Sequence, residues 1–89
     1  MSRLADGVEF QPGMTIYFPN VVDYKIEEVK TPEFNIVRND GDHLTLHTYK
    51  IIYIPHYFST REGAKDVLMR HIERHIKRLQ TAIKTLEEN

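Results

Sequence analysis

Two histidines, His71 and His75, stand four positions apart in the stretch HIERHIKR, and this spacing could serve metal chemistry. Residues four apart on an α-helix lie on the same face, so both imidazoles could bind one metal ion. A zinc site needs three or four protein ligands, however, and the spacing of the other histidines points none of them at this segment. The zinc-protease signature also requires a glutamate directly after the first histidine, where this chain has Ile72. We therefore predict no metal site and no cofactor.

The position of the two histidines around the helix leaves two further interpretations open. With Ile72 placed at zero and about 100° per residue, the apolar residues of this segment fall within roughly 40°, while His75 and His71 lie about 60° and 100° to one side. The first interpretation is a pair of boundary histidines that pack against Ala82 or a neighbouring strand. The second is a pH-sensitive pair at His71 and His75, whose protonation near about pH 6 would weaken half-buried packing.

Side chains suited to covalent or acid–base catalysis are scarce. The chain has no cysteine and no glycine-rich phosphate loop, and its two serines are Ser2, near the start, and Ser59, which precedes a predicted helix. Asp40 and Asp42 flank Gly41, a pattern typical of a tight turn rather than of a catalytic carboxylate pair. We predict no catalytic residue and a chain that is not an enzyme.

Basic residues on the predicted helix offer a nucleic-acid interface. They lie on the face opposite the apolar residues, and are Arg70, Arg74, Lys77, Arg78 and Lys84. Such a face can follow phosphates, yet the helix has only Gln80 to read base edges. The same residues are also typical of a solvated face with ion pairs four residues apart. The two candidate pairs are Asp66–Arg70 and Glu73–Lys77. Non-specific nucleic-acid binding is therefore the alternative function.

Length and composition limit how the chain can be stabilised. Eighty-nine residues make one domain, residues 1–89, with no cysteine for disulfides, so stability must come from a compact core, self-association, or both. Residues 1–58 hold five Lys and Arg against eight acidic residues, which gives −3, and residues 59–89 hold seven against five, which gives +2. An acidic part thus precedes a basic part.

The sequence shows no pattern typical of a membrane span or an export signal. No apolar run approaches the roughly 18–20 residues needed to span a bilayer, and the first ten residues lack the apolar core of a signal peptide. We expect a cytoplasmic protein with no membrane partner.

Residues 8–58 read as short strands separated by turns. The predicted strands cover 14–18, 22–30, 33–38, 43–47 and 48–55. In the second of these the alternation breaks phase at Val29, which predicts a bulge near Glu27-Glu28. In the third, Phe34 and Ile36 would share one face.

The later strands follow a strong turn signal, NDGD at 39–42. Leu44 and Leu46 are expected to point inward, and the pair Ile51-Ile52 predicts burial on both faces. Whether 43–54 forms one bent strand or two short ones stays open. The pattern predicts an α+β fold, in which a small antiparallel sheet or SH3-like barrel of four or five strands precedes one long C-terminal amphipathic helix.

That helix is predicted over about 60–87, where no proline occurs. Its start reads as a capping box in which the Ser59 hydroxyl and the Glu62 carboxylate satisfy each other's backbone N–H groups. Tyr57 and Phe58 would fix the angle at which the helix leaves the sheet. The apolar residues, spaced 4-4-3-4-3, form one continuous stripe. This helix stripe is Leu68, Ile72, Ile76, Leu79, Ile83 and Leu86.

The segment YFSTREGAKDV resembles small bacterial and phage-type proteins with a short β-rich part and a Phe-Ser-Thr-x-Glu-x-Ala entry into a long terminal helix. The matching residues are Gly13, Ile16 and Tyr17, then Phe58, Ser59, Thr60, Glu62 and Ala64. Gly63 departs from the pattern, because such proteins often carry a second glutamate there. The resemblance covers the layout of residues 12–88 and implies a compact accessory or interaction protein.

The length of the predicted helix indicates that part of the helix stripe is an assembly surface. A helix of this size is about 40 Å long, whereas a five-stranded sheet of short strands is only roughly 17–20 Å across. The sheet would leave Leu79, Ile83 and Leu86 uncovered, and the same helix of a second copy is the simplest cover. We therefore expect a homodimer acting as a non-catalytic interaction protein that presents its acidic sheet to a protein partner.

Overall fold

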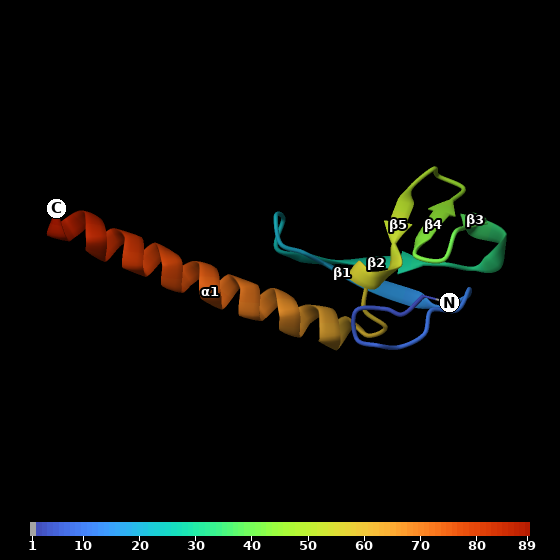
Figure 1. The fold of residues 1–89 in the computed structure, drawn as a ribbon, viewed down its shortest axis with the longest axis horizontal. Helices are drawn as coiled ribbons and strands as arrows, with labels where there is room; N and C mark the ends of the chain where they lie inside the picture. Colours follow the sequence, from blue (N-terminus) through green and yellow to red (C-terminus); the bar gives the residue numbers. More distant parts are fainter. Residues whose placement is uncertain (1) are drawn as a thin grey trace.

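The computed structural model, which describes residues 2–89, shows two small antiparallel sheets followed by one long helix (Figure 1). The strands are β1 (Thr15–Asn20), β2 (Lys25–Lys30), β3 (Ile36–Asn39), β4 (His43–Leu46) and β5 (Ile51–Tyr53), and the helix is α1 (Arg61–Glu88). Single 3-10 turns, Glu33–Asn35 and Ile54–His56, precede β3 and follow β5. Strands β1 and β2 form a hairpin, and β3, β4 and β5 form the second sheet in that order. The predicted α+β fold is confirmed.

The hairpin β1–β2 runs in unbroken register from Thr15 opposite Lys30 to Asn20 opposite Lys25. The bulge predicted near Glu27-Glu28 is therefore wrong. Residues 21–24 form the turn instead of extending the strand, so the alternation begins only at Lys25. The Asn20 side chain accepts hydrogen bonds from the N–H groups of residues 22 and 23 and holds this turn.

The predicted strand at 33–38 is also wrong in its first half. Residues Glu33–Asn35 make a 3-10 turn, which leaves the Phe34 side chain 82% exposed. Pro32 starts this turn, because its ring fixes φ near −63° and its carbonyl accepts the N–H of Asn35. Leu44 and Leu46 are buried as predicted. The 39–42 turn is confirmed: Gly41 has φ +83°, and its N–H donates to the Asn39 side chain.

Residues 43–54 form two strands, with the reversal at Tyr49, whose φ is +62°. The prediction that Ile51 and Ile52 are both buried is wrong, because Ile52 is fully buried but Ile51 is 66% exposed. The reason is position: β5 is the edge strand of its sheet, and nothing in the described chain covers the outer face there.

The core lies between the hairpin and the second sheet. Its buried members are Leu4, Phe10, Ile16, Val29, Leu44, Leu46, Ile52, Ile54 and Tyr57. Leu4 and Phe10 belong to the segment before the first strand, which sequence reasoning did not assign to the core. The Ser2 hydroxyl donates to the Asp42 carboxylate, and the N–H of Phe10 donates to the carbonyl of Ser2. The β-rich body therefore includes residues 2–7 as well as the expected 8–58.

The junction between body and helix is fixed from two directions. The backbones of Tyr17 and Phe58 exchange two hydrogen bonds of 2.9 and 2.7 Å, which tie the residues before α1 to β1. The Tyr57 ring packs on Phe18, with the ring centres 5.2 Å apart. Burial raises the pKa of the Tyr57 phenol, and the nearby Glu27 carboxylate adds to that effect. These contacts support the role predicted for Tyr57 and Phe58.

The predicted capping box is wrong by one residue. Thr60 is the N-cap, and its hydroxyl accepts the N–H of Gly63 at 3.1 Å. Ser59 is unavailable because its N–H and its hydroxyl both donate to the Asp6 carboxylate, at 3.0 and 2.6 Å. Glu62 is then one residue too early to reach back to the cap, so the box does not close.

The Asp6 carboxylate gives a pH-dependent contribution to stability. Burial alone would raise its pKa, but the hydrogen bonds from Ser59 and from the N–H of Val8 outweigh burial and hold the pKa below its ordinary value. The folded state therefore favours the charged form. Its stabilisation is complete above the unfolded pKa of about 3.9 and is lost as the pH falls through the lower folded pKa.

We therefore expect Asp6→Asn to lower the free energy of unfolding at pH 7, and the difference from the native chain to shrink towards about pH 2. Urea unfolding across this range measures it. Glu33→Gln is the control, since the exposed Glu33 side chain accepts no hydrogen bond in the described residues, and its difference should stay flat. A pH-independent difference for Asp6→Asn would contradict the assignment.

Within residues 2–89, α1 is the one helix of membrane-spanning length, and it is too polar to cross a bilayer.

Candidate interaction surface

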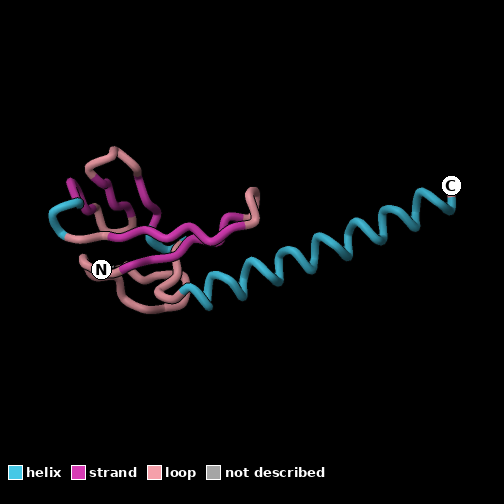
Figure 2. The backbone as a smooth tube through the Cα atoms, turned by 180° about the vertical axis from the view of Figure 1, so that it is seen from behind, coloured by secondary structure: helices cyan, strands magenta, loops and turns pink. Residues whose placement is uncertain are grey.

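The helix α1 leaves the β-rich body after its first turns and projects far beyond it (Figure 2). The molecule is accordingly elongated, 58 × 23 × 18 Å. Ala64 and Leu68 pack against the body and are buried, and Ile72 is half-buried. The four remaining stripe residues are exposed by 47, 51, 57 and 73%, and are Ile76, Leu79, Ile83 and Leu86 in that order. The body thus leaves the second half of the stripe uncovered, as the length of the helix predicted.

One further apolar residue joins this surface. Met69 is half exposed and lies three positions before Ile72 and seven before Ile76, so it continues the same face. Sequence reasoning took Leu68 in its place, although the same spacing was available to find Met69. The exposed apolar face of α1 is therefore Met69, Ile72, Ile76, Leu79, Ile83 and Leu86. We refer to these six residues as the apolar face.

The basic residues occupy the other side of the helix. Arg70, Arg74, Lys77, Arg78 and Lys84 are all exposed. Of the two expected ion pairs, Asp66–Arg70 is formed at 3.4 Å between well-solvated side chains, whereas Glu73 and Lys77 are not paired. An exposed pair of this kind contributes little to stability. The remaining basic side chains keep their charges in solvent.

His71 and His75 are both exposed, and no strand covers their rings. Together with Arg74 and Arg78 they line a shallow groove on the helix surface. Among residues 2–89, no three His, Asp or Glu side chains are grouped so that they could hold a metal ion. Packing of the two rings against a neighbouring strand is therefore wrong, and the pH-sensitive pair stays a prediction.

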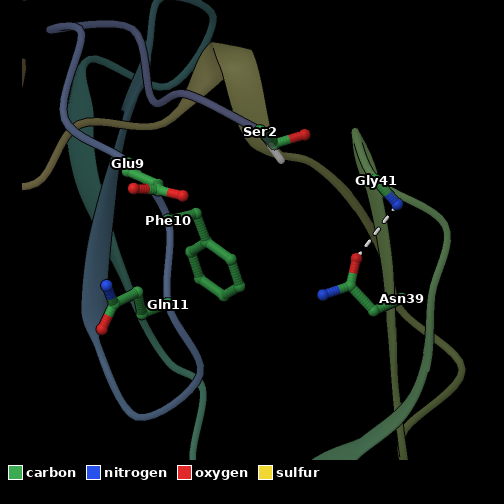
Figure 3. Close-up of a pocket in the computed structure, with 6 residues that line it drawn as sticks. All are labelled: Ser2, Glu9, Phe10, Gln11, Asn39 and Gly41. Carbon is green, nitrogen blue, oxygen red and sulfur yellow. Dashed lines mark hydrogen bonds between the residues drawn. The ribbon is translucent and has the colours of Figure 1, made fainter.

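A hollow of about 470 Å³ opens between the N-terminal segment and the 39–42 turn (Figure 3). The Phe10 ring lies in its middle, with Glu9 and Gln11 on one side and Asn39 and Gly41 on the other. The side-chain oxygen of Asn39 already accepts a hydrogen bond from the N–H of Gly41. The lining offers the Glu9 carboxylate and the Gln11 amide for hydrogen bonds, and it also includes Ser2, whose hydroxyl donates to the Asp42 carboxylate.

Three aromatic rings, from His43, Tyr53 and His56, form a cluster on the outer face of β5. The Tyr53 ring packs on His43 at a tilt of 51°, with the ring centres 5.1 Å apart, and meets His56 edge-on at 4.6 Å. All three rings are exposed. The His43–Tyr53 pair follows from the register of β4 and β5, in which the two residues lie opposite each other, and His56 belongs to the 3-10 turn after β5. Cross-strand ring pairs of this type stabilise a sheet and need no ligand.

No protein-family model matches the chain, and no curated protein or solved structure matches it either. The chain is an α+β protein whose long C-terminal helix carries an uncovered apolar face.

Proposed function

We propose that this chain is a non-catalytic interaction protein of the cytoplasm that self-associates through α1. One observation carries the proposal, namely the rise in exposure along the stripe from 6% at Leu68 to 73% at Leu86. Burying an exposed leucine or isoleucine stabilises an assembly by about 1.5–3 kcal/mol each. A row of such side chains on a projecting helix is therefore a surface for association.

A second copy of the same chain is the partner that fits this surface best. A two-fold pair brings identical apolar faces together, so each stripe meets a stripe of the same length and spacing. Isoleucines and leucines at alternating intervals of three and four residues interlock side by side between two helices. The acidic body then stays free at the ends of the helices to meet another protein.

The experiment that tests the proposal is solution mass by light scattering over a range of concentrations. We expect a mass of twice the 10.5 kDa chain, decreasing towards 10.5 kDa only on dilution. Because the contact is apolar, raising the salt from about 50 to 200 mM should leave the mass unchanged. A mass of one chain at every concentration would contradict self-association.

The alternative function is non-specific nucleic-acid binding. It is supported by the exposed basic side chains on one side of α1, which are Arg70, Arg74, Lys77, Arg78 and Lys84. Phosphate contacts release counterions, so such binding would fall steeply between about 50 and 200 mM salt. Fluorescence anisotropy of a labelled DNA duplex at the two salt concentrations distinguishes it from the apolar association. The interleaved Asp66 and Glu73 weaken this alternative, because they reduce the positive potential of that side.

A further inference from the structure

We propose that the two helices pair in antiparallel orientation, so that the two β-rich bodies lie at opposite ends of the assembly. This inference rests on the proposed self-association and specifies the arrangement of the same surface. Three observations support it: the charge of the last turn of α1, the position of the β-rich body, and the exposed tip of the β1–β2 hairpin.

Charge differs between the middle of α1 and its last turn. Residues 70–78 carry four basic side chains and one acidic, Glu73, which gives +3. The last turn of α1 carries Glu87 and Glu88 and no basic residue. A parallel pair would bring the two acidic turns together, where like charges repel. An antiparallel pair keeps the two acidic turns apart, because they lie at opposite ends of the assembly.

The apolar face has one antiparallel register that pairs every residue. With Ile76 opposite Leu79 of the second copy, Ile72 lies opposite Ile83, and Met69 opposite Leu86. All six residues of the face then have an apolar neighbour in the other helix. Shifting this register by one heptad leaves two residues of the face without apolar partners, Met69 and Ile72 in one direction and Ile83 and Leu86 in the other. The full register thus buries the most apolar area, which is the main source of stability for such a pair.

The β-rich body also favours this orientation. It covers Leu68 and half of Ile72, so in a parallel pair two bodies would have to sit side by side at the same end of the helices. In the antiparallel pair the two bodies lie at opposite ends and do not compete for space. The second helix can then run along the exposed side of Met69 and Ile72.

The tip of the β1–β2 hairpin supplies the third observation. Three apolar side chains are exposed there, Val21, Val22 and Tyr24. Both views of the backbone show the hairpin extending beside the N-terminal half of α1 and ending well short of the C-terminal end of the helix (Figures 1 and 2). In the antiparallel register the last turn of the second helix, with its Leu86, passes along this N-terminal half. The apolar tip then has an apolar neighbour within the same assembly.

Disulfide formation between engineered cysteines tests the orientation, because the chain has no cysteine of its own. Met69→Cys and Leu86→Cys are made as separate variants, mixed in urea, refolded together and oxidised in a glutathione buffer. Facing thiols in a dimer have an effective concentration in the millimolar range, and their Cα atoms must lie within about 7 Å to form a bond. We expect the mixture to form the 69–86 link about tenfold faster than either variant links to itself.

Thr85→Cys, mixed in the same way with Met69→Cys, is the matched control. Thr85 is the neighbour of Leu86 in sequence but lies on the opposite side of the helix, so no link above the background is expected. Peptide mass spectrometry identifies the linked residues, and circular dichroism checks that each variant stays folded.

Each other outcome overturns the inference in a recognisable way. If Leu86→Cys links to itself faster than to Met69→Cys, the helices are parallel, and the proposed self-association survives. If light scattering shows a dimer but the mixture does not link above the Thr85→Cys control, the register is wrong. If the chain is a monomer at every concentration, the inference and the proposed function both fail.

Discussion

Leu79→Glu combined with Ile83→Glu is expected to convert the dimer into a folded monomer. Both side chains lie in the middle of the apolar face and are more than half exposed in the single chain, so the body loses no contact. Glutamate is a good helix former, and α1 should therefore persist. In the dimer, however, four apolar side chains are lost and four carboxylates are placed in the apolar contact. At about 1.5–3 kcal/mol for each apolar side chain, the dissociation constant should rise at least about a thousandfold.

Light scattering at a concentration where the native chain is dimeric gives the result directly, and far-UV circular dichroism reports whether the variant is folded. The control is Thr81→Glu with Thr85→Glu, which adds the same two charges to the same turns of α1 on the opposite, solvent-facing side. This control should remain a dimer. If both double variants keep the native mass, the apolar face is not the contact between copies.

The second large effect is a loss of stability in the β-rich body, where two neighbouring residues, Ile51 and Ile52, have opposite environments. Ile52 is fully buried and lies opposite the equally buried Leu44, whereas Ile51 is 66% exposed on the other face of β5. Truncation of a buried isoleucine to alanine removes its apolar contacts and leaves a cavity, which costs about 2–5 kcal/mol. Truncation of the exposed isoleucine should change stability by no more than about 0.5 kcal/mol.

Urea unfolding of Ile52→Ala and Ile51→Ala measures both effects. The comparison is cleanest in the Leu79→Glu/Ile83→Glu background, because association would otherwise add a concentration-dependent term to the free energy of unfolding. For a body this small, the Ile52→Ala cost is a large share of the total stability. An equal cost for Ile51→Ala would show that the outer face of β5 is covered in solution.

Sequence reasoning succeeded where a long periodic pattern decides the structure. The stripe and the absence of proline predict α1 almost to its ends, and the alternation of Leu44 and Leu46 predicts the buried face of β4. It failed where a short pattern is compatible with two structures. Phe34 reads as a strand residue because it alternates with Ile36, but Pro32 directs the chain into a turn first.

Contacts between distant segments set the remaining differences. Serine is a favoured N-cap residue, but the Ser59 hydroxyl donates a hydrogen bond to Asp6, 53 positions earlier in the sequence. Thr60 is therefore the N-cap of α1. Ile51 and Ile52 have the same side chain, and only the order of strands in the sheet determines which one is buried. The candidate surface depends on both a local pattern and distant contacts. Periodicity predicts the stripe, and the contact of α1 with the β-rich body decides where the exposed part of the stripe begins.

The narrow attachment of α1 also affects the order of the helix itself. Beyond Ile72 the helix has no tertiary contact that buries an apolar side chain, so its backbone hydrogen bonds there are held mainly by local helix propensity. A helical segment of that length is only marginally stable alone in water. Under the proposed pairing, amide hydrogens after Ile72 would exchange quickly in a dilute chain and slowly in a concentrated one, while those of β4 would hardly change. Order in half of the helix would then depend on how much of the chain is present.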